Sequence, residues 1–342
     1  MSSPDFPADF VLDLHDLAAI ILDCHARSEE RFAKSQLVEV IADSDDMQTL
    51  PGRIAFLPEW SAAEKQGQKR LAYVLRRDSK QKLRVTFENF AHRDGVKLQQ
   101  GVELTRRALE SAYWRCKTYD SGFMLAYVAQ RVFESLPPTA RLRARTSSGY
   151  ELICSPTDVM VMEMQVLPHQ ACYIVTYEEV LGPQMIEWER HQSGFLQPMP
   201  WVYLFVGNPV STDAEDDTRV ALDLALMQIG GRGRANEPFA LERGVDYHEK
   251  VLPRFAQESG DLVASGKIAL SPAHIRKQGD DLAEMVLSRL KKMANGDVYF
   301  CGYCGKNGVE TRCSQCKQAR FCKECNALAW KYHKVWCKPT GI

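Results

Sequence analysis

The sequence contains no long apolar segment. Its 342 residues are 45% hydrophobic and 25% charged, yet no run of about 18 or more apolar residues occurs, so we expect no membrane-spanning helix. The first residues, Met1 to Asp5, have neither the basic start nor the apolar stretch of a secretory signal. These absences predict a protein of the cytoplasm or the nucleus.

Motifs that carry catalysis or nucleotide binding are also missing. The chain has no Gly-x-Ser-x-Gly turn and no P-loop. The segment from Gly230 to Arg234 resembles a single, short Arg-Gly segment of a nucleic-acid-binding protein. It lacks the Gly-x-Gly-x-x-Gly spacing that binds a pyrophosphate, and we interpret it as a flexible turn. The acidic run at 213–217 is interpreted as solvated surface. The sequence therefore indicates no catalytic residue, and we do not expect an enzyme.

Cysteine is scarce in the first 300 residues, where only four of the 11 cysteines occur: Cys24, Cys116, Cys154 and Cys172. We expect these four to be small buried apolar residues rather than reactive thiols. His15 and His25 are ten residues apart, which does not match the i, i+4 spacing of two metal ligands on one helix. We interpret both as core or surface histidines.

The body of the chain is expected to be α+β: largely helical, with a short-stranded central sheet. Apolar periodicity predicts helices at about 8–42, 61–77, 102–117, 121–135, 215–229, 246–258 and 272–294. Short β-prone runs between turn residues predict strands at 141–145, 150–154, 159–166, 172–177 and 201–206. Asn295 and Gly296 mark a boundary, so we expect an α+β body at 1–295 and a small C-terminal domain at 296–342.

The remaining seven cysteines lie close together near the C-terminus with one histidine. They form four pairs: Cys301 and Cys304, Cys313 and Cys316, Cys322 and Cys325, and His333 and Cys337. Two thiolates separated by two residues can turn both sulfurs toward one ion, and a closed structural zinc site takes four ligands. Eight ligands make two complete sets, so we predict two zinc ions with no position left for a catalytic water. Spacing alone permits either sequential or interleaved pairing.

Zinc also explains how so short a segment folds. The tail has too few large apolar residues for an autonomous core at about 42 residues. Each structural zinc site contributes about 10–16 kcal/mol, so we expect the metal-free tail to be disordered. Residues 301–342 carry eight basic and two acidic side chains, a formal charge of +6, which leaves −7 on the first 300 residues.

These motifs resemble a known family. The three Cys-x₂-Cys pairs, Ala319-Arg320-Phe321-Cys322 and Trp330-x₂-His333-x₃-Cys337 are similar to the MYND-type zinc finger over residues 301–337. The segment departs from the family in having two residues instead of three between Cys322 and Cys325, followed by Asn326 where the family usually has Gln. Both cysteines still lie on one face of a helix, so we expect metal binding to survive.

The resemblance implies interleaved ligation, with Cys301, Cys304, Cys322 and Cys325 on one zinc and the other four ligands on the second. It also implies a protein-interaction module for a short proline-containing peptide, often in transcriptional or chromatin assemblies. Trp330, Asn326 and the segment Ser314-Gln315 match the region that would form the peptide groove. Trp330 could equally belong to the small core of the finger.

Two other functions are weighed against this one. Some MYND proteins are protein-lysine methyltransferases with a SET domain, and residues 101–105 faintly echo a SET segment, but no accompanying Asn-His motif occurs. The basic tail also suggests nucleic-acid binding. Seven thiolates and two Zn²⁺ reduce its charge to about +3, however, which is modest for binding phosphates. We therefore expect a protein partner and not a nucleic acid; the oligomeric state is left open.

Overall fold

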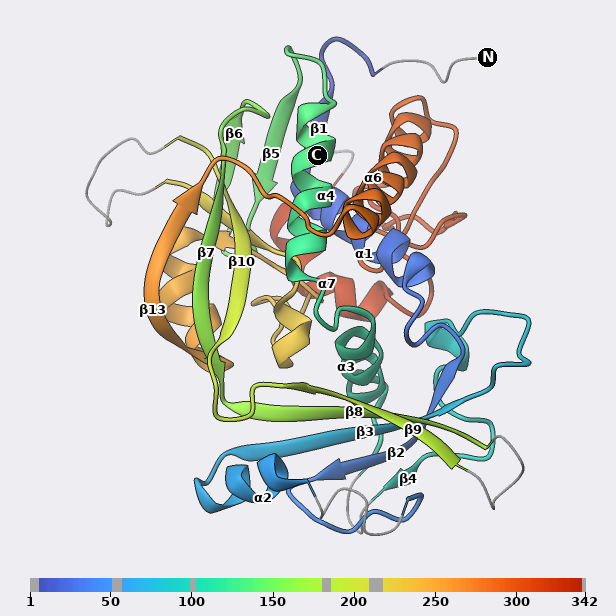
Figure 1. The fold of residues 1–342 in the computed structure, drawn as a ribbon. Helices are drawn as coiled ribbons and strands as arrows, with labels where there is room; N and C mark the ends of the chain where they lie inside the picture. Colours follow the sequence, from blue (N-terminus) through green and yellow to red (C-terminus); the bar gives the residue numbers. More distant parts are fainter. Residues whose placement is uncertain (1–5, 51–56, 99–102, 180–185, 209–217, 340–342) are drawn as a thin grey trace.

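The computed structural model describes residues 6–50, 57–98, 103–179, 186–208 and 218–339. The acidic run at 213–217 lies outside these residues. Within them the chain is an α+β protein, with helices and three antiparallel or mixed sheets (Figure 1). None of the helices that the structure describes combines the length and the apolar character needed to cross a bilayer.

The upper sheet of Figure 1 is antiparallel, with the strand order β12-β11-β10-β7-β13. Its strands are β7 (Val159–Pro168), β10 (Met199–Val206), β11 (Val220–Asp223), β12 (Ala240–Arg243) and β13 (Ala256–Ser265). Six consecutive residues of β10, from Trp201 to Val206, are buried. Burial on both faces explains why this strand reads as a continuous apolar run.

The lower sheet is mixed, with the order β4-β2-β3-β8-β9. Its strands are β2 (Ser35–Ala42), β3 (Lys69–Arg77), β4 (Lys97–Leu98), β8 (Gln170–Glu179) and β9 (Ile186–Ser193). One residue, His169, separates β7 from β8, so the chain passes directly from the upper sheet to the lower one (Figure 1). The helix α2 (Pro58–Lys65) covers one face of the lower sheet, where Trp60 stacks on Tyr173.

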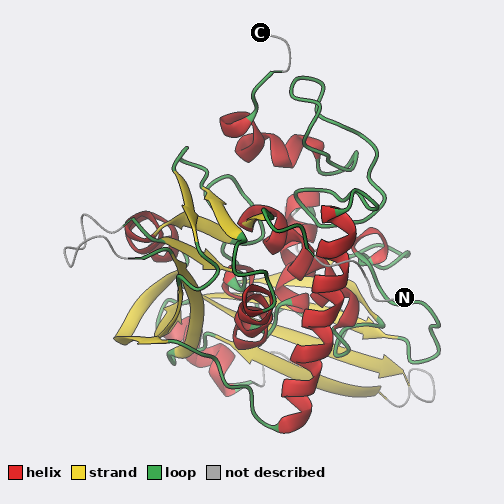
Figure 2. Ribbon diagram, turned by 90° about the horizontal axis from the view of Figure 1, so that it is seen from above, coloured by secondary structure: helices red, strands yellow, loops and turns green. Residues whose placement is uncertain are grey.

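The third sheet and the main helices complete the core. Strands β1 (Val11–Asp13), β5 (Arg141–Arg145) and β6 (Glu151–Cys154) form the small sheet. The helices are α1 (Leu14–Ser28), α3 (Arg106–Lys117), α4 (Gly122–Glu134) and α6 (Ala273–Ala294), with the single-turn α5 (Gly244–Asp246). Helix α4 packs against α1, α6 and β10. Figure 2 shows the C-terminal helix α7 (Asn326–Trp336) at one side of the molecule, beyond these helices.

The body is strand-rich, so the expectation of a largely helical body was wrong. The five predicted strands are present, as are the helices predicted near 102–117, 121–135 and 272–294. The expected helices at 8–42 and 61–77 instead end at Ser28 and Lys65 and are followed by β2 and β3. Both strands lie inside the lower sheet, where apolar residues occupy consecutive positions and their spacing no longer separates strand from helix.

Two further helix predictions failed in the second half. Residues 220–223 form β11, and only a 3₁₀ turn, Leu226–Ile229, remains of the helix expected at 215–229. Gly230 ends this turn in the left-handed region, with φ of +78°, as a glycine that caps a helical turn commonly does. The helix expected at 246–258 is a series of short turns that ends at Arg254, before β13 begins at Ala256.

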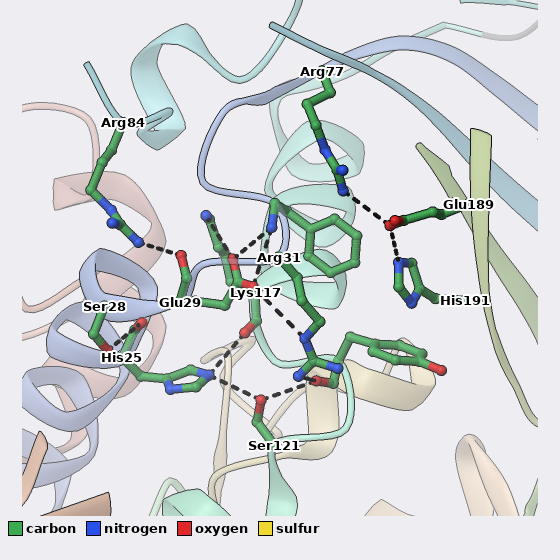
Figure 3. Close-up of polar contacts among 12 residues, drawn as sticks. His25, Ser28, Glu29, Arg31, Arg77, Arg84, Lys117, Ser121, Glu189 and His191 are labelled. Atoms are coloured by element: carbon green, nitrogen blue, oxygen red, sulfur yellow. Dashed lines mark hydrogen bonds and ion pairs between the residues drawn. The ribbon is translucent and has the colours of Figure 1, made fainter. Parts of the chain in front are cut away.

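A buried polar network joins α1, α3 and the lower part of the body (Figure 3). Lys117 Nζ at the end of α3 lies 3.1 Å from Glu29 Oε2, and both side chains are almost fully buried. The Glu29 carboxylate also accepts from the backbone N–H of Phe32 at 3.2 Å. His25 Nε2 lies 2.9 Å from the carbonyl oxygen of Lys117 and 3.0 Å from Ser121 Oγ. The network holds the chain where α1 ends and turns toward β2.

Candidate metal centre

The first Cys-x₂-Cys turn comprises residues 301–306, here called the first knuckle. The backbone N–H of Cys301 donates to the Lys306 carbonyl, and the N–H of Gly305 donates to the Cys301 carbonyl, both at 2.9 Å. Gly305 has φ of +75°, a conformation that glycine adopts without a steric penalty. The tight turn places both sulfurs on the same side of the backbone.

The second knuckle, residues 313–318, repeats this geometry. The N–H of Lys317 donates to the Cys313 carbonyl at 3.0 Å, as Gly305 does in the first knuckle. Lys317 also has a positive φ of +57°, although it carries a side chain. The residue after the second cysteine is therefore left-handed in both knuckles.

Helix α7 supplies or flanks the remaining ligands. The N–H groups of Cys325 and Asn326 donate to the Cys322 carbonyl at 3.0 and 3.1 Å, which begins the helix at Asn326. Cys325 stands at the N-cap, His333 lies two turns later, and Cys337 follows the last helical residue. The shortened spacing between Cys322 and Cys325 is accommodated by this turn.

The structure brings the eight side chains together as two groups of four. One group is Cys301, Cys304, Cys322 and Cys325, and the other is Cys313, Cys316, His333 and Cys337; the ligand atoms within each group all lie within 4.8 Å of one another. The grouping is interleaved, as the family resemblance implies, and the sequential pairing that spacing also permitted does not occur.

The distances inside the groups fit tetrahedral zinc. Sulfurs held about 2.3 Å from one ion at tetrahedral angles lie about 3.8 Å apart, and a sulfur and an imidazole nitrogen about 3.5 Å apart. The observed separations are 3.9 Å between the sulfurs of Cys304 and Cys322 and 3.8 Å between those of Cys313 and Cys337. Cys316 Sγ lies 3.5 Å from His333 Nε2. The donor set and its spacing fit two zinc ions.

Comparison with protein families gives the same result. The family described as the MYND finger matches residues 301–337. This segment is a MYND finger. No solved structure matches the chain. The body, taken as residues 1–295, is therefore described from its structure alone.

The MYND finger packs tightly against the body through its first knuckle. Tyr303, between two zinc ligands, is 1% exposed. Its hydroxyl lies 3.0 Å from the carbonyl oxygen of Asn236 and 3.4 Å from Glu110 Oε2. Glu110 forms a buried ion pair with Arg232 at 2.8 Å. The Arg-Gly segment expected to be a flexible turn therefore holds a buried arginine that helps to seat the finger.

Gly305 brings the same knuckle against α1. A Cβ atom built on Gly305 would lie 2.1 Å from the carbonyl oxygen of Ala19 and 2.7 Å from Asp23 Cβ. No side chain fits in this space. Glycine is thus required at this position for two reasons: the positive φ, and the close approach of the helix backbone.

Helix α7 makes a second contact with the body. The Tyr332 ring stacks on His15 with centroids 3.7 Å apart, and the Tyr332 hydroxyl donates to the Arg145 carbonyl at 2.9 Å. Trp336 Nε1 donates to the Thr146 carbonyl at 2.9 Å. Both aromatic side chains face the β5–β6 hairpin and hold α7 to the body.

Burial suppresses charge at this second contact. Burial lowers the pKa of His15 to about 4, and it raises the pKa of Asp16 and of Glu237 to about 7. His15 Nε2 lies 3.9 Å from Glu237 Oε1, and neither atom has a hydrogen-bond partner among the described residues. These shifts follow from the burial of the three side chains where α7 meets the body.

The outward face of α7 is different. Trp330 is 42% exposed, and its neighbours Asn326, Lys331 and Lys334 are exposed as well. The small core of the finger contains Cys301, Tyr303, Val309, Phe321, Cys325 and Ala329. Trp330 is not among these residues, so the core interpretation of this side chain was wrong. Its ring lies 5.9 Å from the His333 ring, which places it beside the second zinc site.

The other candidates of the sequence analysis have structural roles. His15 and His25 are buried. Burial raises the pKa of all four body cysteines, Cys24, Cys116, Cys154 and Cys172, which disfavours the reactive thiolate. Residues 101–102 of the SET-like segment lie outside the described residues, and Thr105 caps α3 by accepting from the Ala108 N–H. None of these residues takes part in the metal centre.

Proposed function

We propose that this protein is an interaction adaptor, in which the body at 1–295 supports the MYND finger at 296–342 and the finger binds a proline-containing peptide of a partner protein. Assemblies that regulate transcription or chromatin are the proposed setting. The zinc ions are structural, because eight ligands complete two tetrahedral sets and leave no position for a reacting water.

The exposure of Trp330 carries this proposal. The aromatic residues Tyr303, Tyr332 and Phe321 are at most 8% exposed, whereas Trp330 is 42% exposed on a helix that zinc and the body both hold in place. An aromatic side chain on a rigid surface can pack against a polyproline-type peptide, whose extended conformation loses little entropy on binding. The observed exposure of Ser314 and Gln315 keeps this side of the second knuckle open as well.

Peptide titration tests the proposal. Binding of a fluorescein-labelled proline-rich peptide to the full-length zinc-loaded protein is measured by anisotropy for wild type, Trp330→Ala and Tyr299→Ala. Tyr299 is a control of similar exposure, since it is 45% exposed just before the first knuckle, where its ring lies against the Arg320 guanidinium. We expect Trp330→Ala to lower affinity by about tenfold, as loss of an interface aromatic does, and Tyr299→Ala to have no effect. Equal affinity of the three proteins would exclude α7 as the binding site.

A further inference from the structure

The lysines of the finger domain are almost all without acidic partners. Among the described residues, only Lys306 forms an ion pair there, with Glu88 of the body at 2.8 Å. The other five have no such pair in the described part of the chain and are exposed: Lys317, Lys323, Lys331, Lys334 and Lys338. Glu310 and Glu324 are the only acidic residues after residue 300. Lys331 acts on the buried carboxyl of Glu237 in the body. The other four lysines give the outward side of the finger a positive charge.

One of these lysines shares a helix face with the exposed indole. Lys334 follows Trp330 by four residues on α7, whereas Lys331, the next residue, points away from this face and its charge acts on the buried Glu237 of the body. Ala327, three residues before Trp330, adds only a methyl group to this face. A peptide that contacts the indole would therefore have the ammonium group of Lys334 within reach.

Helix stability alone does not account for the arrangement. Lys334 lies in the last turn of α7, where a cation interacts favourably with the helix dipole by about 0.3–1 kcal/mol. This effect explains one lysine. It explains neither the exposure of Trp330 nor the accumulation of cations after residue 300, where the preceding 300 residues have a formal charge of −7.

We propose that the outward face of α7 selects an acidic peptide, in which an apolar residue or proline packs on Trp330 and a neighbouring Asp or Glu residue pairs with Lys334. This inference rests on the proposed function and names the chemistry of the partner. The acidic body repels such a peptide while the basic finger attracts it, so the charge distribution directs the encounter to α7.

A short acidic peptide fits these charges better than a nucleic acid does. With seven thiolates and two Zn²⁺ the finger domain carries about +3, and the body beside it is acidic. A nucleic acid extends beyond the finger and meets the negative body, whereas a peptide of a few residues stays on α7. Phosphate binding also requires several neutralised phosphates for useful affinity.

Paired peptides test the charge preference. Two labelled peptides share one core that contains proline and leucine, flanked in one by four glutamates and in the other by four glutamines. Anisotropy titrations use the full-length zinc-loaded protein at about 50 and about 500 mM salt. We expect the acidic peptide to bind about five- to tenfold more tightly at low salt, and this ratio to approach one at high salt because exposed charges are screened.

Three variants locate the effect. Lys334→Gln should weaken the acidic peptide about threefold and leave the neutral one unchanged, whereas Trp330→Ala should weaken both. Lys267→Gln is the charge control, because this lysine is 82% exposed on the segment before α6, where it pairs with Glu134 at 3.5 Å. It should change neither affinity. Zinc content and circular dichroism confirm that each variant is folded.

The outcomes separate the two proposals. Equal binding of both peptides, dependent on Trp330, would overturn the acidic preference and leave the adaptor function standing. Failure of both peptides to bind would overturn both proposals. A labelled 12-nucleotide DNA that binds as tightly as the acidic peptide, with the same loss in Lys334→Gln, would replace the peptide proposal with polyanion binding.

Discussion

Gly305 offers the sharpest test of how the finger and the body are joined. The change is Gly305→Ala, which adds one methyl group where the first knuckle meets α1. Gly308 provides an unusually close control. Its φ of +76° equals that of Gly305 within a degree, but a Cβ there has nothing within 4 Å.

The two substitutions share one cost and differ in another. An alanine in the left-handed region costs about 1–2 kcal/mol at either position. At Gly305 the added Cβ would also lie 2.1 Å from the carbonyl oxygen of Ala19, which is backbone and cannot rotate away. Overpacking of this kind costs about 1–3 kcal/mol. We expect Gly308→Ala to lose about 1–2 kcal/mol and Gly305→Ala about 2–5 kcal/mol.

Three measurements follow the change. Urea unfolding with zinc present gives the loss of stability, zinc analysis gives the metal content, and hydrogen exchange of peptides that contain Tyr303 reports whether the knuckle leaves the body. We expect both variants to retain two zinc ions, because the ligands are untouched, but only Gly305→Ala to show faster exchange around Tyr303. Equal stability losses with unchanged exchange in both variants would refute the claim that this contact holds the finger in place.

Three further predictions concern the metal sites and the buried network. Cys313→Ser should reduce the zinc content from two ions to one, because it removes a ligand of the second site only; loss of both ions would show that the sites are not independent. Lys117→Met should destabilise the protein by about 3–5 kcal/mol, because Glu29 is left buried without its partner, and the double variant with Glu29→Gln should recover most of this loss in urea unfolding. The pKa of His25 is lowered to about 4 by burial, so its native state binds fewer protons than the unfolded state and the stability it contributes above pH 6.5 is lost as the pH falls toward 4. His25→Gln removes this titration, so the free energy of unfolding should fall by up to about 3 kcal/mol less in the variant than in wild type between pH 6.5 and 4. Parallel pH dependences for the two proteins would contradict the assigned burial.

The metal centre could be predicted in detail because its information is local. The Cys-x₂-Cys turns and the His-x₃-Cys step each place two ligands through a few backbone dihedrals, and tetrahedral coordination then limits the sets to four. The helix at 273–294 was predictable for a similar reason, since it has one exposed polar face and hence a clear helical period.

The body was less predictable where both faces of an element are buried. Residues 35–42 and 69–77 become strands because partners distant in sequence pair with them: β3 pairs with β8, about 100 residues later. The ion pair of Lys117 and Glu29 likewise joins residues 88 positions apart. No local sequence pattern indicates contacts between residues so far apart in the chain.

The sequence by itself determined the eight zinc ligands and the family of the finger, because each depends on short-range spacing. The tertiary structure alone decided which aromatic residues face the body and which face the solvent. Tyr303 contacts Asn236 and Glu110 of α3, Tyr332 contacts His15 of α1 and Arg145 of β5, and Trp336 contacts Thr146, whereas Trp330 remains 42% exposed. Those partners lie between 67 and 317 residues away in the chain. Burial of an aromatic residue depends on surfaces that meet only when the chain is folded.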